Sequence, residues 1–335
     1  MPHWTQPRAA ASAQLMIRVA RDYGMSSDDC ITGTGLVADD LVDPEREIEG
    51  QQELGVVRNM LQTLGPTVPF CVTAGLRYHL TTHGMWGFAM LSARSIRDAI
   101  DVSVRYFDLS YSFNRLSFEV DGSYGHLVYD DSDNADDLRA LLIERDLAAA
   151  ITIQEDMIGY AIPFPKLQLR APRPAYADEL ERVLRVKPQY NAAINCASIA
   201  LSTLEIAPAM ADDLGLRVCQ ERCQTLLDQR RARAGFAGRL RRRILIQPGQ
   251  VPSMSTIAAE LCMSTRTLRN KLTREGTSYR ELVEEVREEL AEQLLFSPMK
   301  VDSIARRLGY ADSSSFIAAF KRWKGVPPRG YARGA

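Results

Sequence analysis

The order of apolar and polar positions predicts a chain built mainly from helices. Apolar residues recur at three- and four-residue spacing over 15–23, 51–64 and 92–108, which is the period of an amphipathic helix. Glycine follows the first two of these runs and marks their ends. A longer run rich in Ala, Leu and Ile predicts a long helix over about 135–159, and a shorter pattern predicts a helix over 176–185.

A different period occurs between the third and fourth of these helices. The segments SFNRLSFEVDG and SYGHLVYDDSD alternate apolar and polar residues, and a glycine-containing turn joins them. This pattern is typical of a β-hairpin. The segment PKLQLRAPRP is bounded by prolines and predicts a further strand. Helices combined with a small sheet predict an α+β domain for the first part of the chain.

The last hundred residues predict a string of short helices. One helix is expected over 235–246, a second after a cap at Ser255, and a third after a cap at Ser264. The inward-facing positions are Ile257, Ala258 and Leu261 in the second helix and Leu268 and Leu272 in the third. The outer face of the third helix carries Arg266, Arg269, Asn270 and Thr273. Two short helices joined by a tight turn predict a helix-turn-helix unit.

The same pattern then occurs a second time. A long helix over 277–296 leads to a helix over 301–308, a turn, and another helix beginning near Asp312. Phe316 and Phe320 repeat the spacing of the two leucines, and the caps Ser264 and Asp312 lie 48 positions apart. A connecting helix of about 18 residues is about 27 Å long. With its turns, that length is close to the separation of successive major grooves on one face of DNA.

Composition indicates an ordinary water-soluble protein. The chain has 335 residues, 46% of them hydrophobic and 25% charged, which is enough for two domains. No run approaches the roughly 20 apolar residues of a membrane span. Arg18, Arg21 and Asp22 interrupt the N-terminal segment before it can form a cleavable apolar signal. We therefore expect a cytoplasmic protein with no membrane partner.

The net charge of −1 conceals two regions of opposite charge. Residues 236–335 hold 18 Lys and Arg against 10 Asp and Glu, a net charge of +8. The preceding residues hold 23 basic and 32 acidic side chains, a net charge of −9. A basic C-terminal module on an acidic body suggests an end that binds a polyanion. A solvated helix face is the alternative for Arg266, Arg269 and Asn270, but the repeated unit and the charge division favour DNA, where Arg pairs with guanine and Asn with adenine.

Metal chemistry has little support in the sequence. Cys219 and Cys223 are four residues apart, but no histidine lies near them, and we expect buried reduced thiols. His79 and His83 share the same spacing without a third ligand; lining a ligand cavity is the alternative for this pair. We expect no metal site and no cofactor.

The C-terminal segment resembles the DNA-binding domain of the AraC/XylS family of bacterial transcription regulators. The matching pieces are IAAELCMSTRTLRNKL, SIARRLGYADSSSFIAAFKRWKGVPPRGY, and the spacing of Arg287, Ala291, Leu294 and Leu295. The resemblance places base contacts on Arg266, Arg269 and Asn270, with Thr267 and Lys271 beside them. In the second unit it places contacts near Ser314, Ser315, Ala318 and Lys321. The family often has an arginine where this chain has Ala318, and a polar residue in place of Ile317. We therefore expect the second helix to bind mainly phosphates through Ser313, Ser314, Lys321 and Arg322.

The upstream half resembles, over Gly84–Phe107 and in the order of its elements, the arabinose-binding-like domain of VirS-type and ornithine-utilisation-type regulators. The resemblance implies effector sensing and dimerisation. Five aromatic residues are candidate walls of an effector cavity, with core packing as the alternative: Trp86, Tyr106, Phe107, Tyr111 and Phe113.

These observations predict a mainly α protein. An α+β sensor and dimerisation domain is expected over 1–206, a helical linker over 207–232, and an all-α DNA-binding domain over 233–333, with helix-turn-helix units at about 255–275 and 303–324. The expected function is that of a ligand-responsive transcription activator, not an enzyme. Its expected partners are double-stranded DNA, RNA polymerase, an unknown small-molecule effector and a second copy of the chain.

Other readings of the chain predict different proteins. The upstream domain could dimerise without sensing a ligand, or the chain could be an architectural DNA-binding protein. A fused alkyl-transfer enzyme would need clustered cysteines, and the six cysteines are dispersed. The acidic face of the connecting helix, Glu284, Glu285, Glu288, Glu289 and Glu292, is expected to be solvated, with a contact to a basic partner as the alternative.

Overall fold

The computed structural model describes residues 7–42, 46–246, 249, 251–296, 299–328, 330 and 331. Two compact units divide the chain: unit 1 covers residues 1–230 and unit 2 covers residues 231–335. This division groups most of the expected linker with unit 1, and the domain limits themselves stay a prediction. Residues 1–6, 43–45, 247, 248, 250, 297, 298, 329, 332 and 333 of the expected domains lie outside the described residues.

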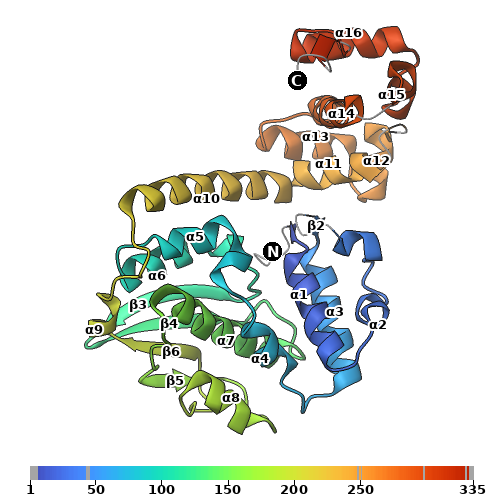
Figure 1. Ribbon diagram of the computed structural model, residues 1–335. Coiled ribbons are helices and arrows are strands. Elements are labelled where there is room, and N and C mark those ends of the chain that lie inside the picture. Colours follow the sequence, from blue (N-terminus) through green and yellow to red (C-terminus); the bar gives the residue numbers. More distant parts are fainter. Residues whose placement is uncertain are drawn as a thin grey trace. The chain divides into compact units, whose positions relative to one another are not determined.

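Unit 1 opens with a helical layer around its own apolar core. Its elements are β1 (Arg8–Ala9), α1 (Ala11–Asp22), α2 (Ser27–Ile31), η2 (Ala38–Leu41), β2 (Glu47–Ile48), α3 (Gly50–Leu64) and α4 (Phe70–Gly75). Strands β1 and β2 form a short antiparallel pair. Met16, Val57 and Met60 are fully buried where α1 and α3 pack together (Figure 1). The apolar faces expected for these two helices are therefore confirmed.

The rest of unit 1 is built on a four-stranded antiparallel sheet. Its elements are η3 (Leu80–His83), α5 (Met85–Leu91), α6 (Ile96–Arg105), η4 (Phe107–Leu109), β3 (Arg115–Asp121), β4 (Tyr124–Asp130), α7 (Arg139–Ile158), β5 (Lys166–Gln168), α8 (Ala177–Leu184), β6 (Asn195–Ala200) and α9 (Leu201–Leu204). The strand order is β3-β4-β6-β5. Asp121 pairs with Tyr124 across a two-residue turn in which Gly122 has φ +47°. The predicted hairpin is confirmed, and the turn requires the left-handed backbone that glycine adopts at no steric cost.

Helix α7 is the central element of unit 1. Its Ile143, Leu147 and Ile151 are buried in the same core as Leu127 of β4 and Ile199 of β6, and Figure 1 shows the helix crossing the sheet. On another side α7 packs against α4 so closely that a Cβ at Gly75 would collide with the carbonyl of Arg145. The helix is buried on more than one face, which explains its nearly continuous apolar sequence.

Helix α10 (Asp213–Ala234) carries the chain from unit 1 into unit 2. Leu216, Cys223 and Leu227 face the core of unit 1, while Leu214 and Val218 on the same helix are exposed. The helix is therefore anchored to unit 1 along one face.

Unit 2 consists, within its described residues, of six helices. They are α11 (Phe236–Ile246), α12 (Met254–Glu260), α13 (Thr265–Arg274), α14 (Tyr279–Leu295), α15 (Val301–Arg307) and α16 (Ser313–Lys324). One apolar cluster joins α11, α12, α13 and the first half of α14, and a second joins the other half of α14 with α15 and α16. Leu290 contacts both clusters. The expected pair of helical units joined by one long helix is confirmed.

Two details of the first predicted unit are wrong. The cap of α12 is Ser253, whose hydroxyl accepts the amide of Thr256 at 3.1 Å, and not Ser255. Leu261 is 42% exposed because it follows the end of α12, where the chain has left the helical path that would turn it inward.

Among the described residues, no helix has the length and apolarity needed to span a membrane.

Candidate nucleic-acid interface and effector cavity

The first helix-turn-helix unit comprises α12, a turn over 261–264, and α13. The turn closes because the amides of residues 261, 262 and 263 donate hydrogen bonds to carbonyl groups of α12. Ser264 then caps α13, its hydroxyl accepting the amide of Thr267 at 3.1 Å. Leu268 and Leu272 are buried, as their spacing predicts. This packing orients α13 and leaves its opposite face exposed.

The second unit repeats this turn in α15 and α16. The amides of residues 308, 309 and 310 donate to α15 in the same pattern, and Asp312 caps α16 by accepting the amide of Ser315 at 2.7 Å. Phe316 and Phe320 are fully buried in the places of the two leucines. The apolar residues before the turn are offset by 47 positions between the units and those after it by 48, so the second turn is one residue longer.

Three of the predicted DNA-contacting side chains form one exposed face of α13. Arg266, Arg269 and Asn270 are exposed and lie at positions i, i+3 and i+4, which share a helix face. Among the described residues, none of the three has a hydrogen-bond or ion-pair partner. The side-chain donors of these residues, and the side-chain carbonyl of Asn270, are therefore free to bind a ligand.

The other two predicted residues of this helix have contacts of their own. The hydroxyl of Thr267 is 2.9 Å from that of Ser264, and its amide is held by the same cap. The ammonium group of Lys271 lies 5.2 Å from the ring centre of Phe236 on α11. Both side chains remain exposed.

Helix α16 exposes fewer long donors, as the sequence predicts. Ser314, Ile317, Ala318 and Lys321 are exposed at helical spacing, and Ser313 is half-buried. The amide of Ser315 is held by the Asp312 cap. Lys321 has no partner in the described part of the chain, whereas Arg322 forms an ion pair with Glu284 of α14 at 3.3 Å.

The acidic face of α14 is partly exposed to solvent, as expected, but most of its carboxylates also form ion pairs within unit 2, which the sequence did not predict. Glu285 pairs with Arg241 of α11, and Lys324 of α16 lies between Glu288, at 2.8 Å, and Glu292. These carboxylates raise the pKa of Lys324, chiefly through their hydrogen bonds. Glu289 remains exposed, with no ion pair among the described residues. Four of the five carboxylates of this face thus bind basic side chains of the neighbouring helices.

Unit 1 contains a cavity of about 120 Å³ beside α7. Its walls come from α5, α6, the sheet and α7, and most of the lining side chains are apolar. Three predicted wall residues, Trp86, Phe107 and Tyr111, line it. Tyr106 and Phe113 do not: Tyr106 is buried in the core of the sheet layer, and Phe113 is fully buried with the guanidinium of Arg8 4.2 Å from its ring centre.

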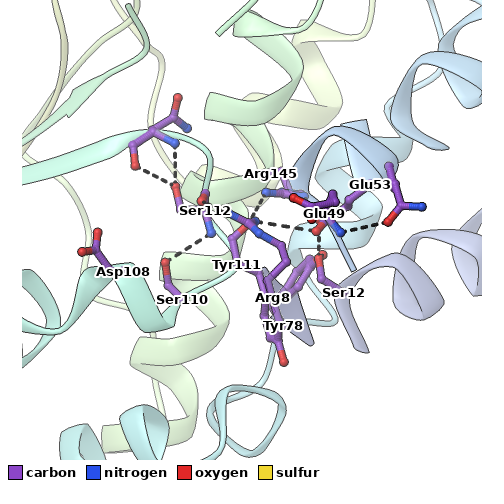
Figure 2. A network of polar contacts seen from close by, with 12 residues as sticks. Arg8, Ser12, Glu49, Glu53, Tyr78, Asp108, Ser110, Tyr111, Ser112 and Arg145 are labelled. Carbon is purple, nitrogen blue, oxygen red and sulfur yellow. Dashed lines mark hydrogen bonds and ion pairs between the residues drawn. The ribbon is translucent and has the colours of Figure 1, made fainter. Parts of the chain in front are cut away.

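Figure 2 shows a buried polar network, and three of its residues, Tyr78, Tyr111 and Arg145, also line this cavity. The Glu53 carboxylate accepts hydrogen bonds from Ser12 at 2.5 Å and from Arg145 at 3.2 Å, and it pairs with Arg8 at 3.6 Å. Both arginines also donate to the carbonyl of Tyr111, at 3.0 Å and 2.8 Å. The network therefore ties α1, α3 and α7 to the loop that carries Tyr111.

Sequence reasoning missed this network, although one signal was available. Glu144, Arg145 and Asp146 form a charged triplet inside the otherwise apolar run of α7. Long charged side chains are almost never buried unless they are paired. The triplet therefore pointed to buried partners, but nothing in the sequence identified Glu53 or Arg8 as those partners.

The paired histidines and cysteines do not form metal sites in the described structure. His79 precedes the short helix η3 and binds Asp156 at 3.0 Å, whereas His83 is turned among Tyr78, Trp86 and Tyr111. Cys223 is buried, Cys219 is partly exposed, and both are reduced. No group of three possible metal ligands occurs among the described residues.

Comparisons with known proteins agree with both halves of this description. Residues 24–207 match the model of the arabinose-binding domain of AraC transcription regulators, and residues 257–334 match a helix-turn-helix domain model. An HTH-type transcriptional regulator of Mycobacterium tuberculosis is 29% identical over 330 residues, covering 96% of this chain and 95% of its own. The ornithine utilization regulator of Pseudomonas aeruginosa is 26% identical over 322 residues, covering 96% and 95%.

A solved structure is also similar. The transcriptional regulator CdpR from Pseudomonas aeruginosa aligns with 84% of this chain and 91% of its own at 25% identity, with a TM-score of 0.43. The family model for the upstream half matches more than half of the chain, and the helix-turn-helix model covers its C-terminal units. The protein is a DNA-binding helix-turn-helix transcription regulator and belongs to the AraC family.

Proposed function

We propose that this regulator reads two successive major-groove segments of one DNA site, with α13 in the first and α16 in the second. The observation that carries the proposal is the repeated turn geometry on either side of α14. Helix α14 has 17 residues and is therefore about 25 Å long. With its turns it spans roughly one helical repeat of DNA, about 34 Å.

The two helices have different tasks in this proposal. Helix α13 offers Arg266, Arg269 and Asn270 as free donors, and side chains of these types recognise guanine and adenine in the major groove. Helix α16 exposes short side chains and Lys321, which suit phosphate contacts. Arg322 forms an ion pair with Glu284. It would have to leave this carboxylate in order to contact a phosphate.

Unit 1 is proposed to bind a small-molecule effector and to mediate self-association. Its cavity beside α7 and the match of residues 24–207 to the model of an arabinose-binding domain support the first role. The second role is proposed because the family resemblance of this half implies it. Effector binding would change how unit 2 engages DNA, and the bound protein would then recruit RNA polymerase. The acidic face of α14 is a poor candidate for the polymerase contact because its carboxylates already have basic partners.

A nuclease footprint on the DNA upstream of the protein's own gene tests this function. The intact chain is compared with a fragment covering residues 231–335, and both are also tested on unrelated DNA. We expect both to protect the same discrete site, about two major-groove segments long. Protection by the fragment alone would mean that unit 1 restrains DNA binding until an effector relieves it.

Two results would contradict the proposal in different ways. Equal binding to all DNA without a discrete site would remove sequence-specific reading and favour an architectural role. A discrete site whose occupancy and transcription respond to no small molecule would leave unit 1 as a dimerisation domain.

A further inference from the structure

The cavity in unit 1 has an apolar wall with very few unsatisfied polar groups. Ile100, Leu116, Leu127, Met157 and Ile199 belong to the wall, from helices and strands that surround it. Its volume of about 120 Å³ is similar to that of cavities that accept a single aromatic ring, which are about 150 Å³. An apolar cavity of this size favours a compact apolar ligand over a sugar, whose several hydroxyl groups would lose their hydrogen bonds to water.

The charged groups at the wall already have partners, and so does the side-chain oxygen of Gln154. Arg145 donates to Glu53 and to the carbonyl of Tyr111, and its Nε lies 3.6 Å from Asp146. Asp146 also accepts hydrogen bonds from Ser112 and Asn114. Gln154 accepts the amide of Ile162 at 2.7 Å. The two arginines of the network, Arg8 and Arg145, are balanced by Glu53 and Asp146, so the wall presents no uncompensated charge to a ligand.

His83 is the exception. Both of its ring nitrogens are shielded from solvent and have no hydrogen-bond partner in the described structure. The ring lines the cavity and is held by Tyr78, Trp86 and Tyr111, with centroid distances of 5.9, 4.8 and 5.4 Å. Burial, with a smaller contribution from the nearby Arg145, lowers the pKa of His83 to about 3. The ring is therefore neutral near pH 7 and offers one donor and one acceptor.

Leaving such atoms unpaired is costly, because a buried polar atom without a partner has lost its hydrogen bond to water. We propose that the cavity binds an uncharged, largely apolar molecule about the size of one aromatic ring, whose hydroxyl or carbonyl group forms a hydrogen bond with His83. The role of this site in regulation rests on the proposed function, whereas the binding of such a molecule in the cavity does not.

The test uses four probes with the full-length protein. Toluene, benzyl alcohol and benzoate share one ring and differ in the polar group, and L-arabinose tests a sugar. Binding is measured by saturation-transfer NMR and by titration calorimetry. We expect benzyl alcohol to bind about threefold to tenfold more tightly than toluene, the effect of one neutral hydrogen bond. Benzoate and L-arabinose are expected to show no saturable binding.

Variants locate the site. His83→Phe keeps a ring of similar size and is expected to make benzyl alcohol bind no better than toluene. His79→Phe is the matched control, because His79 is exposed and does not line the cavity, and it should preserve the preference. Ala150→Leu reduces the cavity volume and should weaken both probes by a similar factor. Thermal denaturation of each variant checks that it folds.

Several outcomes would overturn the site. These are tighter binding of benzoate than of benzyl alcohol, competition by L-arabinose, no binding of either apolar probe to the unmodified chain, or an unchanged preference in folded His83→Phe protein. The footprint is then repeated with saturating benzyl alcohol. Probe binding that follows the prediction without any change in the footprint or in transcription would contradict ligand-responsive regulation and leave the site standing.

Discussion

The exposed side chains of α13 and α16 differ in what they can recognise. Arg269 and Asn270 extend from a helix whose opposite face, at Leu268 and Leu272, is buried, so their positions are set by the packing of that face. On α16, Arg322 and Lys324 are paired with carboxylates of α14, whereas Lys321 is exposed and has no partner among the described residues. Planar donors in fixed positions can discriminate bases, whereas a mobile ammonium group binds any phosphate.

Substitutions on the two helices should therefore have different effects. Arg269→Ala or Asn270→Ala is expected to cost about 1–3 kcal/mol of binding at one base pair and to relax specificity there. Lys321→Ala is expected to weaken binding to all sequences alike and to reduce the slope of log affinity against log salt by about 1. Fluorescence anisotropy with the protected site and its single-base variants, at several salt concentrations, measures both effects. If either α13 variant lost affinity equally on every sequence, its side chain would contact phosphate and not a base.

Glu144 links the stability of unit 1 to pH. It is buried on α7 and accepts a hydrogen bond from Tyr176 at 2.6 Å. Burial raises its pKa from 4.5 to about 7, and the hydrogen bond offsets only part of this shift. Between these values the folded state holds a proton that the unfolded state has released, so stability falls as pH rises from about 4.5 to 7. The loss is of the order of 3 kcal/mol.

Glu144→Gln should remove this pH dependence because the amide stays uncharged. We expect the variant to be about 2–3 kcal/mol more stable than the unmodified protein at pH 8, with most of the difference lost at pH 5. Urea denaturation at the two pH values measures the change. Glu155→Gln controls for the change of net charge, because it removes a carboxylate from the same helix that is 41% exposed and paired only at the surface, with Arg185 at 2.6 Å. A variant less stable than the unmodified protein at pH 8 would show that the Tyr176 bond outweighs the cost of burial.

Helix–helix contacts in unit 2 depend on a cap that comes from a distant part of the chain. The Glu275 carboxylate, at the end of α13, accepts the amides of Phe236 and Ala237 at 2.8 Å each. These amides begin α11 and have no partner within that helix. A carboxylate at this position also faces the positive end of the helix dipole. The proposed reading helix, α13, therefore contacts α11 through Glu275 at its C-terminal end as well as through the buried Leu268 and Leu272.

Loss of this cap should destabilise unit 2. Glu275→Ala is expected to lower its free energy of unfolding by about 1 kcal/mol, within the usual range for a helix cap. The effect is measured by denaturing the 231–335 fragment with the Glu275→Ala substitution. The same fragment with Glu289→Ala is the control, because Glu289 is exposed and makes no ion pair with the described residues. Equal stability of the two variants would mean that water replaces the carboxylate at the start of α11 without loss.

The turns of the two helix-turn-helix units have the same hydrogen-bond pattern but different residues at the position with positive φ. Gly309 has φ +78° in the second turn, and Cys262 occupies the corresponding place in the first turn with φ +51°. A cysteine in this left-handed region carries a steric cost that glycine does not. The turn hydrogen bonds and the buried residues on both sides hold Cys262 in this conformation.

Across the whole molecule, charge and apolar packing are arranged in separate units. The acidic upstream residues and the basic C-terminal hundred residues follow the structural division closely. Unit 2 has two small cores that meet at Leu290, so α14 holds the helix-turn-helix units together through side chains of both clusters. Net positive charge on this unit favours association with DNA, and the negative charge of unit 1 confines that attraction to one end of the chain.

Periodicity and capping residues were sufficient to predict most elements and the outward face of α13. Helical spacing depends on local backbone geometry, so Leu268 and Leu272 turned inward and Arg266, Arg269 and Asn270 outward as expected. The hairpin followed from strict alternation around a glycine turn. Such properties involve neighbours along the chain, and the amino-acid order contains them directly.

Contacts between distant segments could not be obtained in this way. The aromatic residues of 106–113 have similar hydrophobicity, yet packing placed Phe107 and Tyr111 at the cavity, Tyr106 in the core and Phe113 beneath two arginines. The acidic side chains of α14 pair with Arg241 and Lys324, which lie on other helices and could not be identified as their partners from the sequence. The partnership of Arg8, Glu53 and Arg145, and the unpartnered ring of His83, likewise arise only when segments far apart in the chain pack together, because burial and pairing depend on neighbours in space.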